Sequence, residues 1–163
     1  MTSISGFVDL QVNGFMGVDF SGPDLTEAAC REACYELFSR GTAAFLPTII
    51  TSPIGVYERN LPMLARLVHS EEFRGRLLGL HLEGPFISGR SGAVGAHDPD
   101  YVRPPDPNLL EQLLAWGDGA VRLLTVAAEL PGVEALAKMA VDHGVTVSVG
   151  HSLFTTEDLD RMS

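Results

Sequence analysis

Basic residues and cysteines are scarce in this sequence. Eleven Lys and Arg stand against 21 Asp and Glu in 163 residues, which gives a formal net charge of -10. So acidic a chain lacks the positive surface that follows nucleic-acid phosphates, and we expect no nucleic-acid partner. The two cysteines, Cys30 and Cys34, lie in an expected helix. They are not a disulfide framework, and we interpret them as small buried hydrophobic residues.

Long hydrophobic runs are also missing. No stretch reaches the roughly 18 apolar residues of a membrane-spanning helix, and residues 1–5 lack the charged and apolar regions of a signal peptide. We therefore expect a cytoplasmic protein without a membrane partner. The sequence is 45% hydrophobic and 20% charged, which is ordinary for a globular domain with one core.

Apolar segments rich in β-branched residues alternate with longer segments of helical periodicity. This alternation is typical of β/α units and a parallel sheet. Because polar residues rarely alternate with apolar ones in the apolar segments, we expect strands buried on both faces. The expected strands cover residues 6–12, 43–50, 76–82, 121–127 and 145–150.

Helices are expected between these strands, at about 25–40 and 131–143 and in three further segments. A polar N-cap residue or an early proline suits the first turn, whose backbone N–H groups lack partners within the helix. The expected starts are Asp24 with Glu27 as a capping box, Ser52 with Pro53, Asp106 with Pro107, Pro131, and Thr155 with Asp158.

Three of the expected strands end in polar side chains. Glu83 ends the third strand and is followed by Gly-Pro, and His151 follows the fifth. Gln11 and Asn13 lie at the end of the first. Active sites of (β/α) barrels are built at this end of the strands, so the pattern indicates a metal-centred catalytic face.

A long segment without helical periodicity, residues 84–105, leaves the strand that presents Glu83. Loops of this length inside compact domains are usually functional. The segment contains His97 and could lay this side chain over a metal. A carboxylate and an imidazole are good ligands for Zn²⁺ or Fe²⁺, and a third protein ligand with an open water position would complete a hydrolytic centre.

Each of these residues also has a purely structural interpretation. Glu83 could cap backbone N–H groups at the strand end, and His151 could be a hydrogen-bonded histidine at a strand end. Gln11 and Asn13 could serve a turn, because Asn-Gly is a strong turn signal. His81 points to the opposite face from its strand neighbours, and we assign it to the core or to the surroundings of the ligands.

Five motifs follow one another along the sequence: Gly6 to Gly14, Leu46-Pro47-Thr48, Gly79 to Phe86, Gly95-Ala96-His97 and Gly150-His151-Ser152. Their order and spacing resemble those of the N-acetylglucosamine-6-phosphate deacetylase family of the amidohydrolase superfamily. The His-Leu-Glu-Gly-Pro element with a downstream Gly-His-Ser is the most specific part of this resemblance.

The resemblance implies roles for individual residues. Glu83 and His151 would be metal ligands, while Ala96 and His97 would contact the substrate, with His97 helping to polarise the acetamide carbonyl. Many amidohydrolases have His-x-His at the end of the first strand, where this sequence has Gln11 and Asn13. Amide side chains are poor ligands for such cations, so these two residues border a site that holds a single ion.

The resemblance further implies a metal-dependent deacetylation of N-acetylglucosamine 6-phosphate, a small phosphorylated amino sugar, by a protein that is a homo-oligomer at full length. The divalent ion would be Zn or Fe. Two alternatives stay open: N-acetylgalactosamine 6-phosphate as substrate, or a non-catalytic association module.

The same resemblance places a second metal-binding histidine, a phosphate-contacting Asn-Ala and a general-base aspartate after Ser163. We therefore expect residues 1–163 to be a single partial (β/α)8 TIM-type barrel domain, with about five of eight parallel strands and no activity alone.

Overall fold

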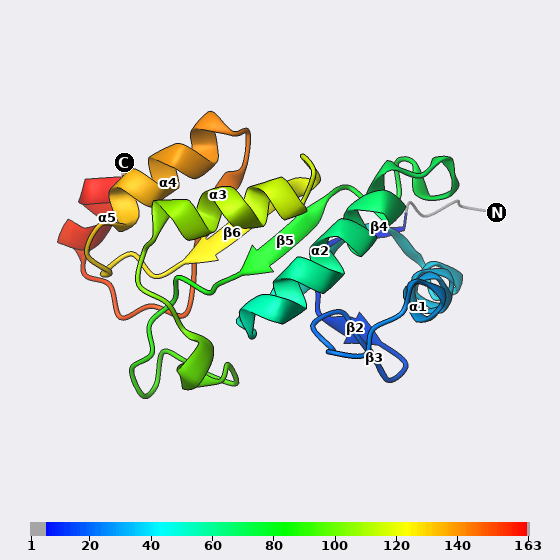
Figure 1. Cartoon of the computed structure of the whole chain (residues 1–163), viewed down its shortest axis with the longest axis horizontal. Helices are drawn as coiled ribbons and strands as arrows, with labels where there is room; N and C mark the ends of the chain where they lie inside the picture. The colour runs from blue at the N-terminus through cyan, green and yellow to red at the C-terminus, as the bar shows by residue number, and fades with distance from the viewer. Residues whose placement is uncertain (1–5, 163) are drawn as a thin grey trace.

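The computed structural model describes residues 6–162. Within that range, five strands form one parallel sheet in the order β1-β4-β5-β6-β7. The sheet curls into part of a barrel and confirms the fold class expected from the sequence (Figure 1). Its strands are β1 (Phe7–Val12), β4 (Thr42–Ile50), β5 (Leu80–Glu83), β6 (Val121–Val126) and β7 (Thr146–Val149).

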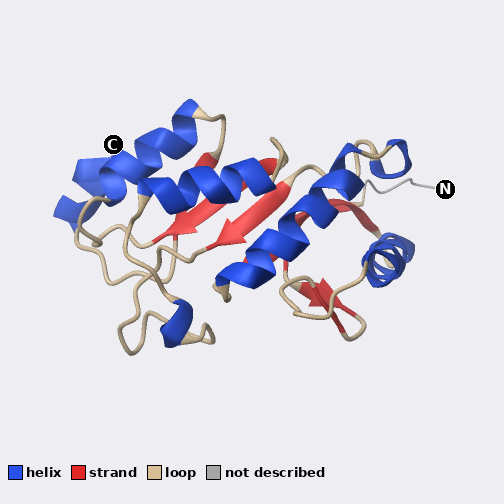
Figure 2. Cartoon of the chain, in the orientation of Figure 1, coloured by secondary structure: helices blue, strands red, loops and turns tan. Residues whose placement is uncertain are grey.

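Helices connect the strands and cover one face of the sheet. α2, α3 and α4 lie side by side across this face, and α1 lies beside a small hairpin of β2 and β3 (Figure 2). None of the helices in residues 6–162 is long and apolar enough to cross a bilayer. The remaining elements are β2 (Gly14–Phe15), β3 (Val18–Asp19), α1 (Glu27–Ser39), α2 (Ile54–His69), α3 (Pro107–Trp116), α4 (Val133–Asp142), α5 (Thr156–Met162) and the short 3-10 helices η1 (Glu71–Phe73) and η2 (Pro99–Tyr101).

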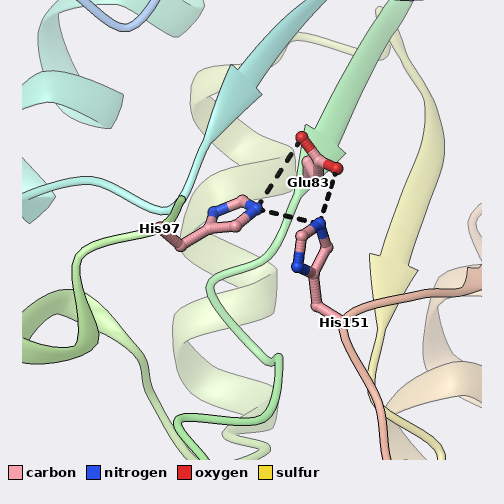
Figure 3. A group of neighbouring side chains, drawn as sticks. All are labelled: Glu83, His97 and His151. Atoms are coloured by element: carbon pink, nitrogen blue, oxygen red, sulfur yellow. Dashed lines mark hydrogen bonds and ion pairs between the residues drawn. The ribbon is translucent and has the colours of Figure 1, made fainter. Parts of the chain in front are cut away.

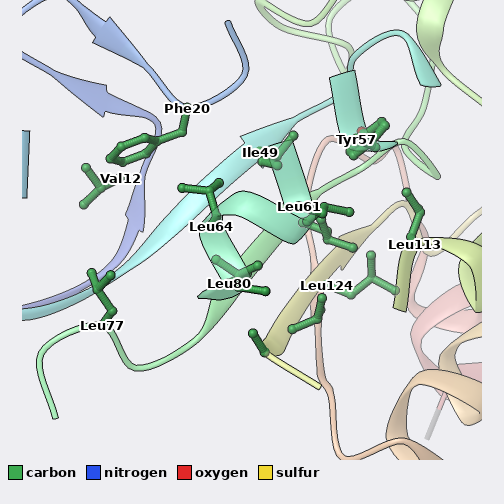
Figure 4. Packing of buried hydrophobic residues seen from close by; sticks show 14 of the residues in the cluster. Val12, Phe20, Ile49, Tyr57, Leu61, Leu64, Leu77, Leu80, Leu113 and Leu124 are labelled. Carbon is green, nitrogen blue, oxygen red and sulfur yellow. The ribbon is translucent and has the colours of Figure 1, made fainter. Parts of the chain in front are cut away.

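The hydrophobic core lies between the sheet and its helices (Figure 4). Leu61 and Leu64 of α2 pack in one cluster with Leu80 of β5, and Leu113 of α3 and Leu124 of β6 extend it. All five are at most 1% exposed. Because burial of one such side chain contributes roughly 1.5–3 kcal/mol, this cluster fixes the strands whose ends build the site.

The expectation that all five strands are buried on both faces is wrong for β1. Its side chains are exposed from Phe7 to Gln11, and Phe7 itself is 79% exposed. β7 is only partly buried. Both strands lie at the ends of the strand order, so in the described structure each pairs on one side alone.

Two helix starts differ from those expected. The hydroxyl oxygen of Thr26 caps α1 by accepting a hydrogen bond from Ala29 N at 3.2 Å, so the capping box at Asp24 is wrong. Pro53 occupies the N-cap position of α2, and the Ser52 hydroxyl instead donates to the Ile50 carbonyl at 2.8 Å. In both cases the side chain named from the sequence lies one or two positions too early.

Two other helix starts are confirmed. Asp106 caps α3 by accepting from Asn108 N at 2.9 Å, with Pro107 as the first helical residue. Thr155 and Asp158 form a reciprocal pair at α5: Thr155 N donates to the Asp158 carboxylate at 2.6 Å, and Asp158 N donates to the Thr155 hydroxyl at 3.3 Å. α4 begins at Val133, two residues after Pro131.

Candidate functional site

Three side chains converge at the carboxyl end of the sheet (Figure 3). Glu83 is the last residue of β5, His151 follows β7, and His97 reaches in from the loop after β5. One possible ligand atom from each lies within 4.8 Å of the other two. His151 Nε2 is 3.1 Å from Glu83 Oε1 and 3.1 Å from His97 Nε2, which in turn is 3.9 Å from Glu83 Oε2.

Glu83 is fixed by strands on both sides. It pairs with Ile50 of β4 and Thr125 of β6, and it is 6% exposed. The next residue, Gly84, has a φ of +92°, and a Cβ there would lie 2.2 Å from the Thr51 hydroxyl oxygen. Only glycine allows this backbone conformation so close to Thr51. The chain therefore leaves the direction of β5 directly after Glu83.

His151 is held in one ring orientation. Its Nδ1 lies 2.9 Å from the Ala93 carbonyl oxygen, which can only accept a hydrogen bond. Nδ1 therefore carries a proton, and in the neutral ring Nε2 carries the lone pair. The loop comes close to the ring at Gly95, where a Cβ would lie 3.1 Å from His151 Cε1.

His97 has the opposite arrangement of protons. The Thr51 backbone N–H can only donate, and it lies 3.3 Å from His97 Nδ1. The proton of the neutral His97 ring is therefore on Nε2, which donates to His151 Nε2. Burial lowers the pKa of His97, and the neighbouring His151 ring lowers it further, so the neutral ring is the stable form.

The spacing of these groups tests whether a cation fits the site. His151 Nε2 and Glu83 Oε1 are atoms of the kind that bind a divalent cation, and they lie 3.1 Å apart. Zn–N and Zn–O bonds are about 2.0–2.2 Å long, so both atoms can reach one ion. The donor set therefore fits a divalent metal.

A cavity of about 230 Å³ opens above these groups. It brings together all the site residues expected from the sequence, including Ala96 in the loop and the amide side chains near the end of β1. The lining residues are Gln11, Asn13, Ile50, Glu83, Ala96, His97 and His151.

The Asn-Gly sequence at the end of β1 does not form the tight hairpin turn. The hairpin of β2 and β3 turns at Met16 and Gly17, whose φ values are 51° and 83°. Asn13 precedes β2, and its carbonyl accepts a hydrogen bond from Phe20 N at 2.9 Å. The turn interpretation of Asn13 is therefore wrong, and its side chain borders the cavity instead.

His81 lies below the site and apart from the three converging side chains. It is 2% exposed, with Nδ1 3.3 Å from the Thr48 hydroxyl and Nε2 2.8 Å from the Thr125 hydroxyl. These contacts join β5 to both neighbouring strands, which confirms its assignment to the core.

Sequence reasoning missed the groups that orient the two site histidines. Thr51 and Ala93 act through a backbone N–H and a backbone carbonyl, so their side chains carry no signal of the role. Glu129, whose carboxylate contacts the segment after His151, was also missed because it lies 22 residues away in sequence.

The known proteins to which this chain is similar share one enzyme name. No protein-family model matches the chain. It is 36% identical over 152 residues to N-acetylglucosamine-6-phosphate deacetylase from Bos taurus, covering 91% of this chain and 36% of that protein. It is 35% identical over 156 residues to the enzyme of the same name from Haemophilus influenzae, covering 94% of this chain and 38% of the relative.

Solved structures show the same relationship. The crystal structure of N-acetyl-D-glucosamine-6-phosphate deacetylase from Mycobacterium smegmatis superposes with a TM-score of 0.87 at 31% identity, covering 98% of this chain and 40% of that one. A mutant of the same enzyme has been solved in complex with N-acetyl-D-glucosamine-6-phosphate. The chain thus spans well under half the length of the relatives it matches.

Proposed function

We propose that this chain, which is related over nearly its whole length to part of the N-acetylglucosamine-6-phosphate deacetylases, supplies the metal-binding part of an amide hydrolase of that family. The observation that carries the proposal is the convergence of two possible ligand atoms, His151 Nε2 and Glu83 Oε1, which lie 3.1 Å apart at the carboxyl end of the strands. The likeness to these enzymes supports an acetamide of a phosphorylated amino sugar as substrate.

Glu83 and His151 would hold a divalent ion, Zn or Fe. When bound, such an ion polarises a carbonyl and makes a water molecule nucleophilic near neutral pH. His97 differs from the two ligands because its Nε2 carries a proton. It would donate a hydrogen bond to the acetamide oxygen, where negative charge develops during attack on the carbonyl carbon. Ala96 would contact the sugar, and Gln11 and Asn13 would border the ion.

Residues 1–163 would form one partial barrel domain of this enzyme. The family resemblance places a second metal-binding histidine, the phosphate-contacting Asn-Ala and the general-base aspartate outside these residues. Without a general base, whose help is worth about 10²- to 10⁴-fold, we expect residues 1–163 alone to show no turnover. A cytoplasmic location and a homo-oligomeric full-length protein stay predictions.

The direct test is acetate release from N-acetylglucosamine 6-phosphate by the full-length protein. We expect turnover that a chelator abolishes and that Zn²⁺ or Fe²⁺ restores. Full turnover in the presence of a chelator, or none with metal supplied, would contradict the proposal. N-acetylgalactosamine 6-phosphate assayed in parallel decides between the two epimers.

The role of His97 is tested by the same assay. His97→Leu removes the donor at Nε2, so we expect kcat to fall by about 10²- to 10³-fold, the usual loss for one oxyanion donor. The bound metal should stay at the wild-type level, because Glu83 and His151 are unchanged. Loss of the metal in this variant would show that His97 is a ligand instead.

A further inference from the structure

The carboxylate of Glu129, which is not one of the three converging side chains, accepts hydrogen bonds from the chain next to His151. Glu129 lies in the loop between β6 and α4. Its Oε2 accepts a hydrogen bond from the Ser152 hydroxyl, and its Oε1 accepts one from Leu153 N at 2.9 Å. The Ser152 hydroxyl oxygen in turn accepts from Ala128 N at 3.1 Å. The two residues after His151 are thus tied to the end of β6.

The loop that follows Glu83 also interacts with this part of the chain. Ser88 in this loop is buried, and its hydroxyl helps to lower the pKa of the Glu129 carboxylate. Ser88 N donates to the His151 carbonyl at 2.9 Å. Burial alone raises the pKa of Glu129, but the hydrogen bonds from Ser152, Leu153 and Ser88 outweigh it, so the pKa lies below its ordinary value. The group is a charged acceptor at neutral pH.

The backbone of His151 needs such support. Its φ is +49°, in the left-handed region that residues other than glycine rarely adopt. Such a conformation persists only where the surroundings impose it. The direction of Nε2 depends on this backbone, because the ring leaves the chain from the residue that is strained. The contacts that fix residues 151–153 therefore determine whether the His151 ring faces Glu83.

We propose that Glu129 is a positioning residue: its carboxylate holds residues 151–153 so that His151 Nε2 meets Glu83 at the metal site. This inference rests on the proposed function, since it assigns the residue that supports a proposed ligand. Glu129 is not among the residues that line the cavity at Glu83. It acts through the hydrogen bonds to Ser152 and Leu153, and partners of this kind typically change metal affinity by 10- to 100-fold when they are replaced.

The test compares Glu129→Gln with Glu134→Gln in the full-length protein, using Zn²⁺ titrated against a chromophoric chelator. Glutamine keeps the size of the side chain but loses the charge and one acceptor oxygen. Glu134 is a matched control because it also accepts a hydrogen bond across elements, from Arg161 Nε at 2.8 Å, without contacting residues 151–153. We expect Zn²⁺ affinity to fall about 10- to 100-fold in Glu129→Gln and to stay unchanged in Glu134→Gln.

A second readout separates positioning from a general loss of stability. Co²⁺ bound in place of Zn²⁺ gives visible bands whose intensity per bound ion reports the ligand set. We expect weaker bands in Glu129→Gln, because water replaces a misplaced imidazole, and wild-type bands in Glu134→Gln. Ser152→Ala, which leaves the carboxylate in place, should show a smaller change in the same direction, and it decides the matter if Glu129→Gln fails to fold by circular dichroism.

The possible outcomes separate the two proposals. Suppose that the wild type binds metal and that folded Glu129→Gln shows the same Zn²⁺ affinity and the same Co²⁺ bands. This result would overturn the role of Glu129 and leave the proposed function intact. If the wild type binds neither Zn²⁺ nor Co²⁺, the proposed function falls, and the role of Glu129 falls with it.

Discussion

His97 and His151 differ in which ring nitrogen carries the proton, and the difference separates their chemistry. The Ala93 carbonyl holds a proton on Nδ1 of His151, so in the neutral ring Nε2 carries the lone pair that can bind a metal. The Thr51 N–H does the reverse for His97 and leaves a donor at Nε2. Two histidines in one cavity thus offer one ligand and one hydrogen-bond donor. The metal-dependent amide hydrolysis proposed for this chain would use both functions.

A third histidine, His81, links site and stability. Burial lowers its pKa, and the charge of Glu83 opposes this shift without reversing it. The unfolded chain, with an ordinary histidine pKa of about 6.5, therefore takes up a proton at a higher pH than the folded one. The free energy of unfolding should be steady at higher pH and should fall as the pH drops below about 6.5.

Urea unfolding between pH 8 and pH 5.5 measures this dependence. His81→Phe should be less stable by about 1–3 kcal/mol at pH 8, because the Thr48 and Thr125 hydroxyls lose a partner. Its stability should also fall less steeply with pH than that of the wild type. Part of the slope should persist, since the pKa of His97 is lowered as well. An unchanged slope in the variant would exclude His81 as its source.

The site residues could be predicted because each stands at a place that the sequence marks. Glu83 and His151 follow apolar runs, and His97 lies in a segment without periodicity. Their proton positions could not be predicted, since they depend on backbone groups brought close by folding. The same limit applies to Glu129, whose partners 152 and 153 become neighbours only when β6 and β7 pair.

At the scale of elements, the sequence predicted the order of helices and strands better than their ends. The hairpin of β2 and β3 was missed, because strands of two residues are too short to show an alternating pattern. β5 begins at Leu80 and not at residue 76, since Gly79 with a φ of +146° interrupts the extended chain. At α1 the sequence pattern predicted Asp24 as the cap, whereas Thr26 has the extended backbone of an N-cap and accepts the capping hydrogen bond.

The start of α1 gives a prediction with an internal control. Thr26→Ala removes the hydroxyl that accepts from Ala29 N, so the free energy of unfolding should fall by about 1 kcal/mol. Asp24→Ala should leave it nearly unchanged, because Asp24 lies outside the cap. Chemical denaturation of both variants measures the difference. A larger loss of unfolding free energy in Asp24→Ala than in Thr26→Ala would support the capping box expected from the sequence.

At the scale of the molecule, both ends of the described sheet are open. Along β1, Phe7 is 79% exposed and Val8 and Leu10 are each 57% exposed. A hollow of about 560 Å³ lies beside β7, is lined in part by Val147 and Val149, and does not include Glu83 among its lining residues. Open strand edges with apolar side chains pair readily with other strands. The remaining strands of a complete barrel would cover them.

We therefore expect residues 1–163, produced alone, to self-associate. Val8→Lys should reduce the association, because a lysine on an edge strand opposes pairing with another chain. Sedimentation velocity over a range of concentrations measures both proteins. A monodisperse wild-type monomer with a sharp cooperative melt would show that the edges are protected without partners. Strong binding of residues 1–163 to proteins unrelated to this enzyme would instead favour the alternative that the chain is a non-catalytic association module.

The metal content of two variants of the full-length protein tests the account most directly. Glu83→Gln removes the anionic ligand, and no neighbouring group replaces its charge, so the purified protein should lose its metal together with its activity. Gln11→Ala alters a side chain that only borders the cavity and should keep most of the metal. Stoichiometric metal in Glu83→Gln, with metal lost from Gln11→Ala, would contradict the assignment of the site.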